Sequence, residues 1–297
     1  MIAALVPVFI MILLGWLLRR YAFGDESFWA MAERITYFVF FPALLVNRLG
    51  HADLSGFQVL PLAGAMILAV IVLWGLALLV ARPLGLARPG ASSLVQGAIR
   101  FNTYVGFAAA SALWGTAGLT LAAIVAAIMI PTVNVISVIA LTGRQAGLRQ
   151  IVLSVVRNPL ILACLIGAGL SSSGTGIPAL IQQVLEILGA AALPLGLLAV
   201  GAALDYQAAA ASKAAIVAGV VLKLLVFPAV MALSLHLFGV QGLTAGTALL
   251  WASLPVASSA YVMSRMLGGD ARLMAGIITA STVAALVSMP AVLLLLG

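Results

Sequence analysis

Helix-length apolar runs follow one another along almost the entire chain, and they constrain the fold more than any other feature. The residues are 65% hydrophobic and only 7% charged, whereas roughly 25% of the residues of an ordinary soluble domain are charged. A bilayer core about 30 Å thick needs roughly 20 apolar residues per spanning helix, which leaves room here for about ten spans. The sequence therefore predicts an all-α polytopic membrane protein that lies in a lipid bilayer.

Hydropathy and the positions of Pro and Gly divide the chain into ten predicted transmembrane helices. These spans cover residues 2–19, 28–49, 58–81, 93–113, 117–140, 152–172, 177–204, 214–237, 242–265 and 271–296. One set of alternate connections is basic, and it holds Arg19, Arg20, Arg82, Arg88, Arg144, Arg149, Lys213, Arg265 and Arg272, whereas the other holds Arg48 alone. By the positive-inside rule the basic set is cytoplasmic, so both termini are expected on the outer side. The compact loops favour a bacterial inner (plasma) membrane.

Several classes of function do not fit this sequence. The net charge is +7, but the basic residues are scattered at helix ends, so we expect no nucleic-acid partner. Cys164 is the only cysteine, which excludes an intrachain disulfide and a thiolate metal cluster. The chain has neither an HExxH motif nor a GxxxxGK[ST] phosphate loop. We therefore expect no enzyme, no catalytic residue, no metal and no cofactor, and transport energy from a gradient or the membrane potential.

The longest basic connection separates five predicted spans from five others. Because five is odd, the second set should be inverted relative to the first. Local features recur in order in the two halves: Pro7 with Pro159, Pro42 with Pro194, and Pro131 with Pro290. We predict two inverted five-helix repeats, residues 1–141 and 151–297, joined by a cytoplasmic linker at 142–150. Repeats of this kind work by alternating access.

The fourth and ninth predicted spans are both interrupted by polar or helix-breaking residues. Lipid cannot bond to freed backbone groups, so irregular chain at membrane depth survives only inside protein or beside a wet cavity. Corresponding broken helices point to a transporter's binding site, where the positive ends of half-helices favour an anion such as a carboxylate. The candidate substrate-binding residues are Arg100, Asn102, Thr103, Tyr104, Pro255, Ala257, Ser258 and Ser259, with Gly106 at the first helix break.

Each of these residues could also have a purely structural role. Arg100 lies about 10 Å inside the cytoplasmic end of its span, where it either binds an anion or snorkels to the interface. Asn102 and Thr103 either bind the substrate or satisfy backbone groups at a kink. The residues that we expect to bend or break other spans are Pro131, Asn134 and Pro290.

Three further ionisable residues lie in the predicted spans. Glu186 is either a proton-coupling residue or half of an ion pair with Lys223 or Arg100. Lys223 either attracts the substrate or takes the place of a coupling cation. His236, near the outer end of its span, is expected to be solvated.

Several local patterns resemble those of a known family over essentially the whole chain. They are Pro7, Tyr37-Phe-Val-Phe-Phe-Pro42-Ala-Leu-Leu, Arg100-Phe-Asn102-Thr-Tyr-Val-Gly106-Phe, Pro131-Thr-Val-Asn134, Asn158-Pro159, Pro255 with Gly269-Asp270 after it, and Ser281-Thr282 before Pro290. In order and spacing they are similar to those of the auxin efflux carriers, whose bacterial members include proposed malonate transporters. The long cytoplasmic loop of the plant carriers is absent here.

The resemblance implies a particular division of the spans. Spans four and nine would cross at their breaks, with Asn102 and Thr103 at one and Pro255, Ala257 and Ser258 at the other. Spans one, two, six and seven would form a scaffold that mediates homodimerisation, and the other six a transport bundle. Sodium-coupled bile-acid relatives use an acidic residue in span nine that is missing here, which argues against sodium coupling.

We therefore expect a secondary active transporter that moves a small organic anion, such as malonate or an auxin-like acid. One alternative is a cation/proton antiporter of similar inverted-repeat build, which would place acidic residues at the crossing. A second alternative is a membrane receptor that binds a ligand without transporting it, which would require docking surface that these short loops do not offer.

Overall fold

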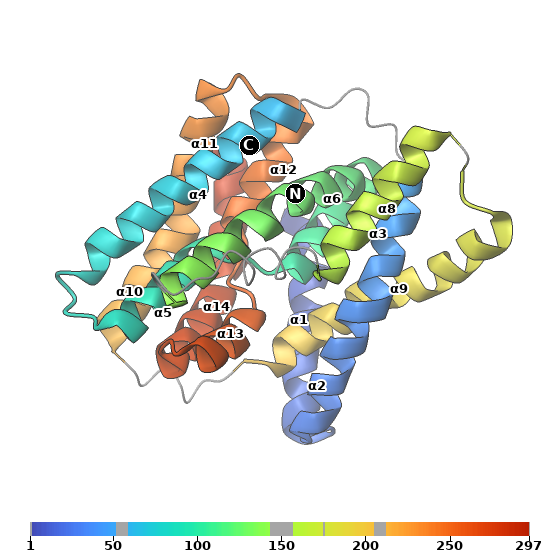
Figure 1. Ribbon diagram of the computed structural model, residues 1–297. Helices are drawn as coiled ribbons and strands as arrows, with labels where there is room; N and C mark the ends of the chain where they lie inside the picture. Colours follow the sequence, from blue (N-terminus) through green and yellow to red (C-terminus); the bar gives the residue numbers. More distant parts are fainter. Residues whose placement is uncertain (1, 52–58, 143–156, 175, 205–211, 297) are drawn as a thin grey trace. The chain divides into compact units, whose positions relative to one another are not determined.

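The computed structural model describes residues 2–51, 59–142, 157–174, 176–204 and 212–296 (Figure 1). Every regular element within these residues is a helix, and none of them is a strand. The all-helical class predicted from the sequence is therefore confirmed. Apart from Thr142, the predicted linker at 142–150 lies outside the described residues, as does the start of the sixth predicted span.

The helices range from single turns to segments longer than a bilayer span. In chain order they are α1 (Ile2–Tyr21), α2 (Glu26–Ile35), η1 (Thr36–Phe40), α3 (Phe41–Gly50), α4 (Val59–Ala81), α5 (Arg88–Ile99), α6 (Thr103–Thr142), α8 (Pro159–Ser173), α9 (Ala179–Ala202), α10 (Lys213–Val221), η4 (Leu222–Val226), α11 (Phe227–Leu237), α12 (Gly242–Ser253), α13 (Ser259–Leu267) and α14 (Ala271–Leu296). The two η elements are single π-helical turns that join the α-helices on either side into continuous segments.

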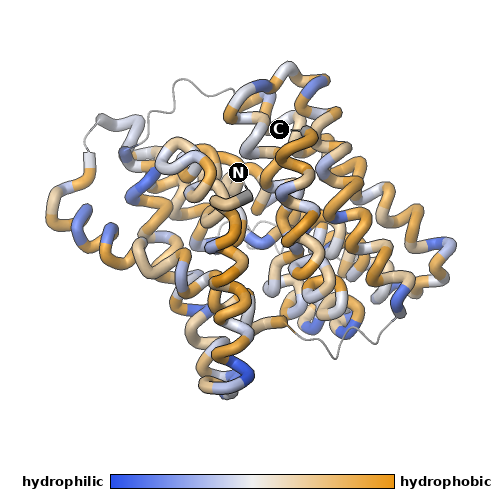
Figure 2. The backbone as a smooth tube through the Cα atoms, turned by 180° about the vertical axis from the view of Figure 1, so that it is seen from behind, coloured by the Kyte–Doolittle hydropathy of each residue, from blue (hydrophilic) through white to orange (hydrophobic). Residues whose placement is uncertain are grey.

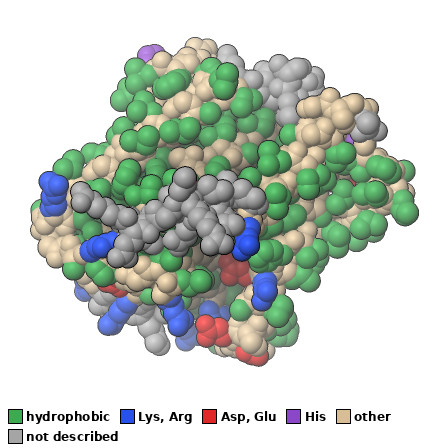
Figure 3. Space-filling model, viewed as in Figure 1, with side chains coloured by type: hydrophobic (Ala, Val, Ile, Leu, Met, Phe, Trp, Pro, Cys, Tyr) green, Lys and Arg blue, Asp and Glu red, His purple; other side chains and the backbone are tan. Residues whose placement is uncertain are grey.

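Seven helical stretches among the described residues are long and apolar enough to cross a membrane. They are Ala3–Tyr21, Glu26–Gly50, Val59–Ala81, Arg88–Leu141, Ala179–Ala202, Lys213–Leu237 and Ala271–Leu295. Apolar residues colour most of their length in Figure 2, and hydrophobic side chains cover much of the surface in Figure 3. A surface of this kind is stable in lipid, so the chain is a multi-pass membrane protein.

The count of seven differs from the predicted ten for reasons that are visible in the chain. The stretch Arg88–Leu141 is 54 residues long and covers two predicted spans. Predicted span nine is divided into α12 and α13, which have only 12 and 9 residues. The helix α8 has 15 described residues, and the preceding part of predicted span six lies outside the described residues.

Prolines inside the long helices do not interrupt them. Pro131 lies within α6 and Pro290 within α14, so the expected breaks at these residues are wrong. The interruption of α6 lies instead at Gly115, with φ 57° and ψ −136°. Only glycine adopts this backbone conformation readily, because any Cβ would be strained. Gly115 therefore divides α6 within the predicted loop between spans four and five.

Two other prolines are accommodated by the π-helical turns. One turn directly precedes Phe41-Pro42 and the other directly precedes Phe227-Pro228. Proline lacks an N–H group, and its ring clashes with the carbonyl four residues earlier. In each case the phenylalanine N–H bonds five residues back, to Thr36 O or Leu222 O, instead of four. The wider turn lets both helices continue past a residue that would otherwise break them.

Side chains of the preceding residues cap the starts of α2 and α8. Asp25 starts α2 by accepting the Ser27 N–H at 2.8 Å, and this bond, with a second from the Ser27 hydroxyl, lowers the pKa of the Asp25 carboxyl. Asn158 starts α8 by accepting the Leu160 N–H at 2.9 Å. Pro159 follows it in the first turn, where a missing N–H costs nothing. Asn158-Pro159 is therefore a helix-start signal.

The helices form two compact units. Unit 1 comprises Met1–Phe57, Phe107–Ala127 and Val155–Ala203, and unit 2 comprises Gln58–Gly106, Ile128–Ser154 and Leu204–Gly297. In unit 1, α9 packs against α1 and α3, and α3 also packs against α8. In unit 2, α4 packs against α5 and α11, and α14 packs against α5, α10 and α12. Each unit draws on both halves of the chain.

Glycines set the close approach of the helices in unit 1. A Cβ added at Gly15 of α1 would overlap the backbone of Leu198 in α9, and one at Gly201 of α9 would overlap the carbonyl of Ile12 in α1. A Cβ at Gly189 would lie 3.1 Å from the Leu44 Cα. Small residues permit such backbone contact, which drives helix association in membranes.

We expect Gly201→Ala to destabilise the protein, because the new methyl group meets backbone that cannot rotate away. Overpacking of this kind costs about 1–3 kcal/mol. The matched control is Gly75→Ala in α4, where nothing lies within 4 Å of the added Cβ, and where alanine should stabilise the helix by about 0.5–1 kcal/mol. Thermal unfolding in detergent measures both changes. Equal melting temperatures for the two variants would contradict the proposed close packing of α1 and α9.

Candidate functional site

The chain leaves helical geometry at two places in unit 2, and the two places touch. The first lies between α5 and α6, and the second between α12 and α13. At both, the residue after the first half-helix is extended, with ψ 148° at Arg100 and ψ 149° at Leu254. The Asn102 N–H donates to the Pro255 carbonyl across the two breaks at 2.8 Å. Two segments about 150 residues apart in sequence are thus joined by a backbone hydrogen bond.

The first break is created by an asparagine without any proline. The Asn102 side-chain oxygen accepts the backbone N–H groups of Tyr104 at 3.1 Å and Val105 at 3.3 Å. This is the bonding of an N-cap residue, which starts a helix by satisfying donors that have no intrahelical partner. Asn102 is 2% exposed, so water cannot replace these bonds. Asn102 therefore ends one half-helix and begins the next.

The second break is created by a proline and completed by a serine on α14. Residues before proline avoid helical geometry, which fits the extended Leu254, and Pro255 has no N–H to donate. The Val256 N–H, which no longer bonds within the helix, donates to the Ser281 hydroxyl oxygen at 3.1 Å. That hydroxyl donates in turn to Ile278 O at 3.0 Å. Sequence reasoning gave Ser281 no role at this break.

Arg100 lies in the interior of unit 2 and is only 9% exposed, so it does not snorkel to an interface. Its guanidinium donates to Asn134 Oδ1 at 3.0 Å, to Ser259 Oγ at 3.3 Å and to Met263 Sδ at 3.5 Å. These three bonds hold the guanidinium in one orientation. The bond to Ser259 directs the positive charge at the start of α13.

The start of α13 differs from the start of α6. No side-chain bond from Ser258 caps α13, whereas Asn102 caps α6 with two. Ala257 and Ser258 are half-buried and Ser259 is exposed, so this end of the helix is accessible. Thr103, at the start of α6, is also half-buried. The positive end of α13 and the Arg100 guanidinium therefore act at the same place.

Gly106 does not break a helix, which corrects the prediction from the sequence. It lies in the first turn of α6, where its N–H donates to the Asn102 carbonyl at 3.0 Å. A Cβ at this position would lie 2.8 Å from the Leu254 Cδ1 and 3.1 Å from the Trp251 ring. Glycine is needed here because the end of α12 approaches α6 closely. The break itself lies earlier, at residues 100–102.

Asn134 was also expected to break its helix, and it does not. It lies within the continuous part of α6 that follows Gly115, and its side chain accepts a hydrogen bond from Arg100. Tyr104 likewise contributes its backbone N–H to the Asn102 cap, and its side chain is buried. These two residues support the crossing, whereas the residues nearest to accessible space are Thr103, Ala257, Ser258 and Ser259.

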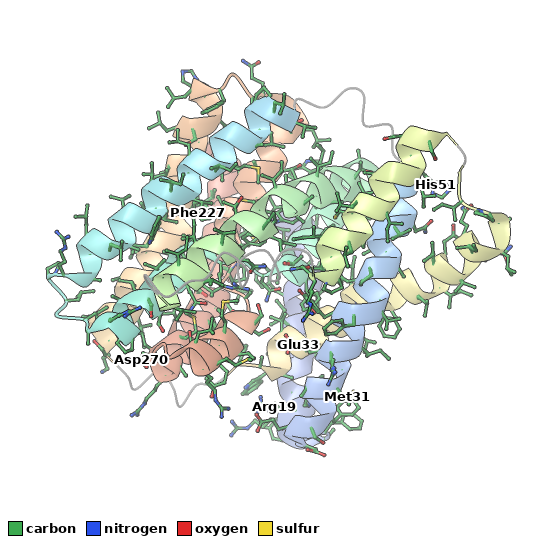
Figure 4. The ribbon with its side chains drawn as sticks, in the orientation of Figure 1. Arg19, Met31, Glu33, His51, Phe227 and Asp270 are labelled. Atoms are coloured by element: carbon green, nitrogen blue, oxygen red, sulfur yellow. The ribbon has the colours of Figure 1, made fainter. Side chains whose placement is uncertain are left out.

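The remaining ionisable residues have separate surroundings. Glu186 in unit 1 is exposed on α9 and accepts a hydrogen bond from Gln182 Nε2, one turn away, at 2.9 Å. Lys223 in unit 2 is fully buried in η4 and donates to the Ala252 carbonyl at 3.3 Å. Its ammonium group lies 4.5 Å from the ring centroid of Phe227, which is labelled in Figure 4. His236 is exposed in the last turn of α11.

A polar cluster that the sequence reasoning missed connects α5 with α13. Gln96 Nε2 donates to Ser264 Oγ at 2.9 Å, and the Ser93 hydroxyl donates to the Asp270 carbonyl at 3.0 Å. Asp270, labelled in Figure 4, directly follows α13 and its C-terminal glycines. Ser93 and Gln96 lie three residues apart, which places them on one face of α5, and Arg100 directly follows that helix. That spacing was the signal in the sequence.

Comparisons with known proteins identify the family of the chain. The profile of a family described as membrane transport protein matches residues 144–293, which is 150 of the 297 residues. The chain is also 28% identical over 296 residues to an uncharacterized transporter of Methanothermobacter thermautotrophicus, and the match covers 95% of this chain and 94% of the relative. The chain therefore belongs to the membrane transport protein family, which is that of the auxin efflux carriers.

Proposed function

We propose that the protein is a secondary active transporter that carries a small organic anion, a carboxylate such as malonate or an auxin-like acid, by alternating access. The observation that carries the proposal is the position of Arg100. Its buried guanidinium is held by Asn134 and Ser259 at the start of α13. This point adjoins the one where two broken helices meet through the bond between Asn102 and Pro255.

The local electrostatics favour a negative ligand. A helix N-terminus carries a partial positive charge and N–H groups that point outward, which makes it an anion-binding site. A guanidinium beside it adds a full positive charge and binds carboxylates in a bidentate manner. Asn102 occupies donors at the start of α6, and in α13 the Ala260 and Tyr261 N–H groups bond to the carbonyls of Ala257 and Ser258. The anion would therefore bind chiefly to Arg100, with the positive end of the α13 dipole beside it. Thr103, Ser258 and Ser259 would orient it.

The arrangement of the helices supports alternating access by two inverted repeats. Unit 1 contains α1, α2 with α3, α8 and α9, the spans that the family resemblance assigns to a dimerising scaffold, together with Phe107–Ala127 of α6, which the resemblance assigns to the transport bundle. Unit 2 contains both breaks, as a transport bundle requires. We therefore propose ten spans, five in each of residues 1–141 and 151–297. By the positive-inside rule both termini would face the outside of an inner membrane.

The antiporter alternative receives no support from the crossing. It requires an acidic residue that exchanges protons beside the two breaks. Residues 100–106 and 254–261 contain no Asp or Glu, and Glu186 bonds to Gln182 of its own helix.

We expect Arg100→Gln to weaken anion binding about ten- to a hundredfold, because a hydrogen bond to a charged group contributes about 1.5–3 kcal/mol. The matched control is Arg265→Gln, which removes an exposed arginine from the last turn of α13. The measurement is uptake of radiolabelled malonate and indole-3-acetate into proteoliposomes over a range of concentrations. Equal uptake by wild type and by a correctly inserted Arg100→Gln protein would refute the proposed role of Arg100.

Substitutions at Asn102 separate the helix cap from the effect of charge. Asp and Asn are equally good N-caps, so Asn102→Asp should keep the cap, but its buried carboxylate should lower the melting temperature and abolish uptake of the same anions. Asn102→Ala should instead lower stability by about 1 kcal/mol through loss of the cap. Thermal unfolding and uptake are measured on both proteins. An Asn102→Asp protein that transports like wild type would show that the anion does not bind near this residue.

A further inference from the structure

Lys223 is a buried lysine that takes no part in the proposed anion site. Its side chain is fully buried within unit 2. It is one of only two lysines in the chain, and the other, Lys213, is exposed at the start of α10. The helices that pack against η4 are α4, α5, α10, α11, α12 and α14, and none of them contains an Asp or a Glu. Its ammonium group bonds instead to a backbone carbonyl and lies against the Phe227 ring.

That carbonyl has lost its helical partner because of the second break. In an uninterrupted helix, Ala252 O would accept the N–H of Val256, four residues later. Pro255 prevents this, and the Val256 N–H donates to Ser281 instead. Lys223 Nζ donates to Ala252 O at 3.3 Å. The lysine thus occupies the negative, carbonyl end of the half-helix α12.

The carbonyl ends of broken helices are where ion-coupled carriers of inverted-repeat build bind their cation. An ammonium group is a compact point charge that can make three hydrogen bonds, so it can replace a bound alkali-metal ion. A residue that served only as a hydrogen-bond donor would not need a charge, and a fully buried charge is expensive. Both the position and the charge of Lys223 therefore match those of a coupling cation.

We propose that the Lys223 ammonium is a covalently attached cation at the carbonyl end of α12, where it takes the place of an inorganic coupling cation. The inference rests on the proposed anion-carrier function for its consequence, which is that the anion binds without sodium. The lysine holds the end of α12 next to Pro255, and so keeps the partner of Asn102 in place. Removal of the side chain should leave a carbonyl-lined site that a small free cation can enter.

The test is chemical rescue of Lys223→Ala by free cations. Wild type, Lys223→Ala and the matched control Lys213→Ala are melted in detergent at constant ionic strength in choline, sodium or ethylammonium chloride. We expect Lys223→Ala to melt lower than wild type in choline and to be stabilised saturably by sodium or ethylammonium. Wild type and Lys213→Ala should melt equally in the three salts. The proposal would be overturned if Lys223→Ala melted at the same temperature in all three salts, or if sodium stabilised wild type saturably.

A second variant distinguishes a charge from a hydrogen bond. Lys223→Gln keeps a donor for Ala252 O but no charge, so it should also show cation-dependent stability if the charge matters. If neither variant folds, the melting of wild type decides. Stabilisation of wild type by sodium would contradict the proposal that Lys223 takes the place of a coupling cation, and the lack of such stabilisation would support it.

The consequence for the anion is measured separately with Tris malonate and Tris acetate as probes. We expect malonate to raise the melting temperature of wild type equally in choline and in sodium chloride. Its affinity for Lys223→Ala should fall at least tenfold in choline and recover in sodium or ethylammonium. If neither malonate nor acetate changes the melting temperature of any of these proteins, the assignment of these anions fails. The rescue by free cations still tests the proposal for Lys223. If malonate binds wild type only with sodium, the resident-cation proposal fails and the anion assignment stands.

Discussion

The need of every buried backbone group for a partner governs the centre of this protein. Two helices are broken in unit 2, and the groups that the breaks release are satisfied one by one. The Asn102 N–H bonds to the Pro255 carbonyl, the Val256 N–H to Ser281, and the Ala252 carbonyl to Lys223. In lipid, each group left without a partner would cost several kcal/mol. These bonds therefore stabilise the crossing together, and the residues proposed to serve transport lie beside them.

The local pattern of the sequence predicts the two helix breaks better than the bonds that satisfy them. Polar residues inside apolar helices were enough to identify both breaks, because such residues are costly in lipid unless protein or water surrounds them. The bonding depends on contacts between distant segments, and periodicity does not reveal these. The sequence predicted that Asn134 breaks its helix, whereas its side chain accepts a hydrogen bond from Arg100. It made the same prediction for Gly106, whereas that glycine makes room for Leu254 and Trp251. Likewise, nothing in the sequence near Ser281 indicates that its hydroxyl accepts the Val256 N–H.

The number of spans is likewise harder to predict from the sequence than the class of the fold. Composition alone establishes a helical membrane protein, whereas counting its spans requires knowing where helices end. Gly115 divides a helical stretch of 54 residues where the sequence predicts the loop between spans four and five, whereas the end of α5 at Ile99 lies inside a predicted span. Prolines are equally ambiguous, since Pro131 and Pro290 remain inside helices while Pro255 lies in a break.

The π-helical turn that precedes Phe227-Pro228 has a consequence for the register of its helix. Such a turn amounts to one extra residue in an α-helix, and one residue corresponds to about 100° of rotation around the axis. The side chains before the turn therefore face a direction different from the one that a regular helix would give them. Lys223 lies within this turn and is buried, whereas Leu225, two residues later, is 57% exposed. A deletion of a single residue within this turn would rotate Lys223 by about 100° around the helix axis relative to the residues that follow it, and so would change which neighbours surround its amino group.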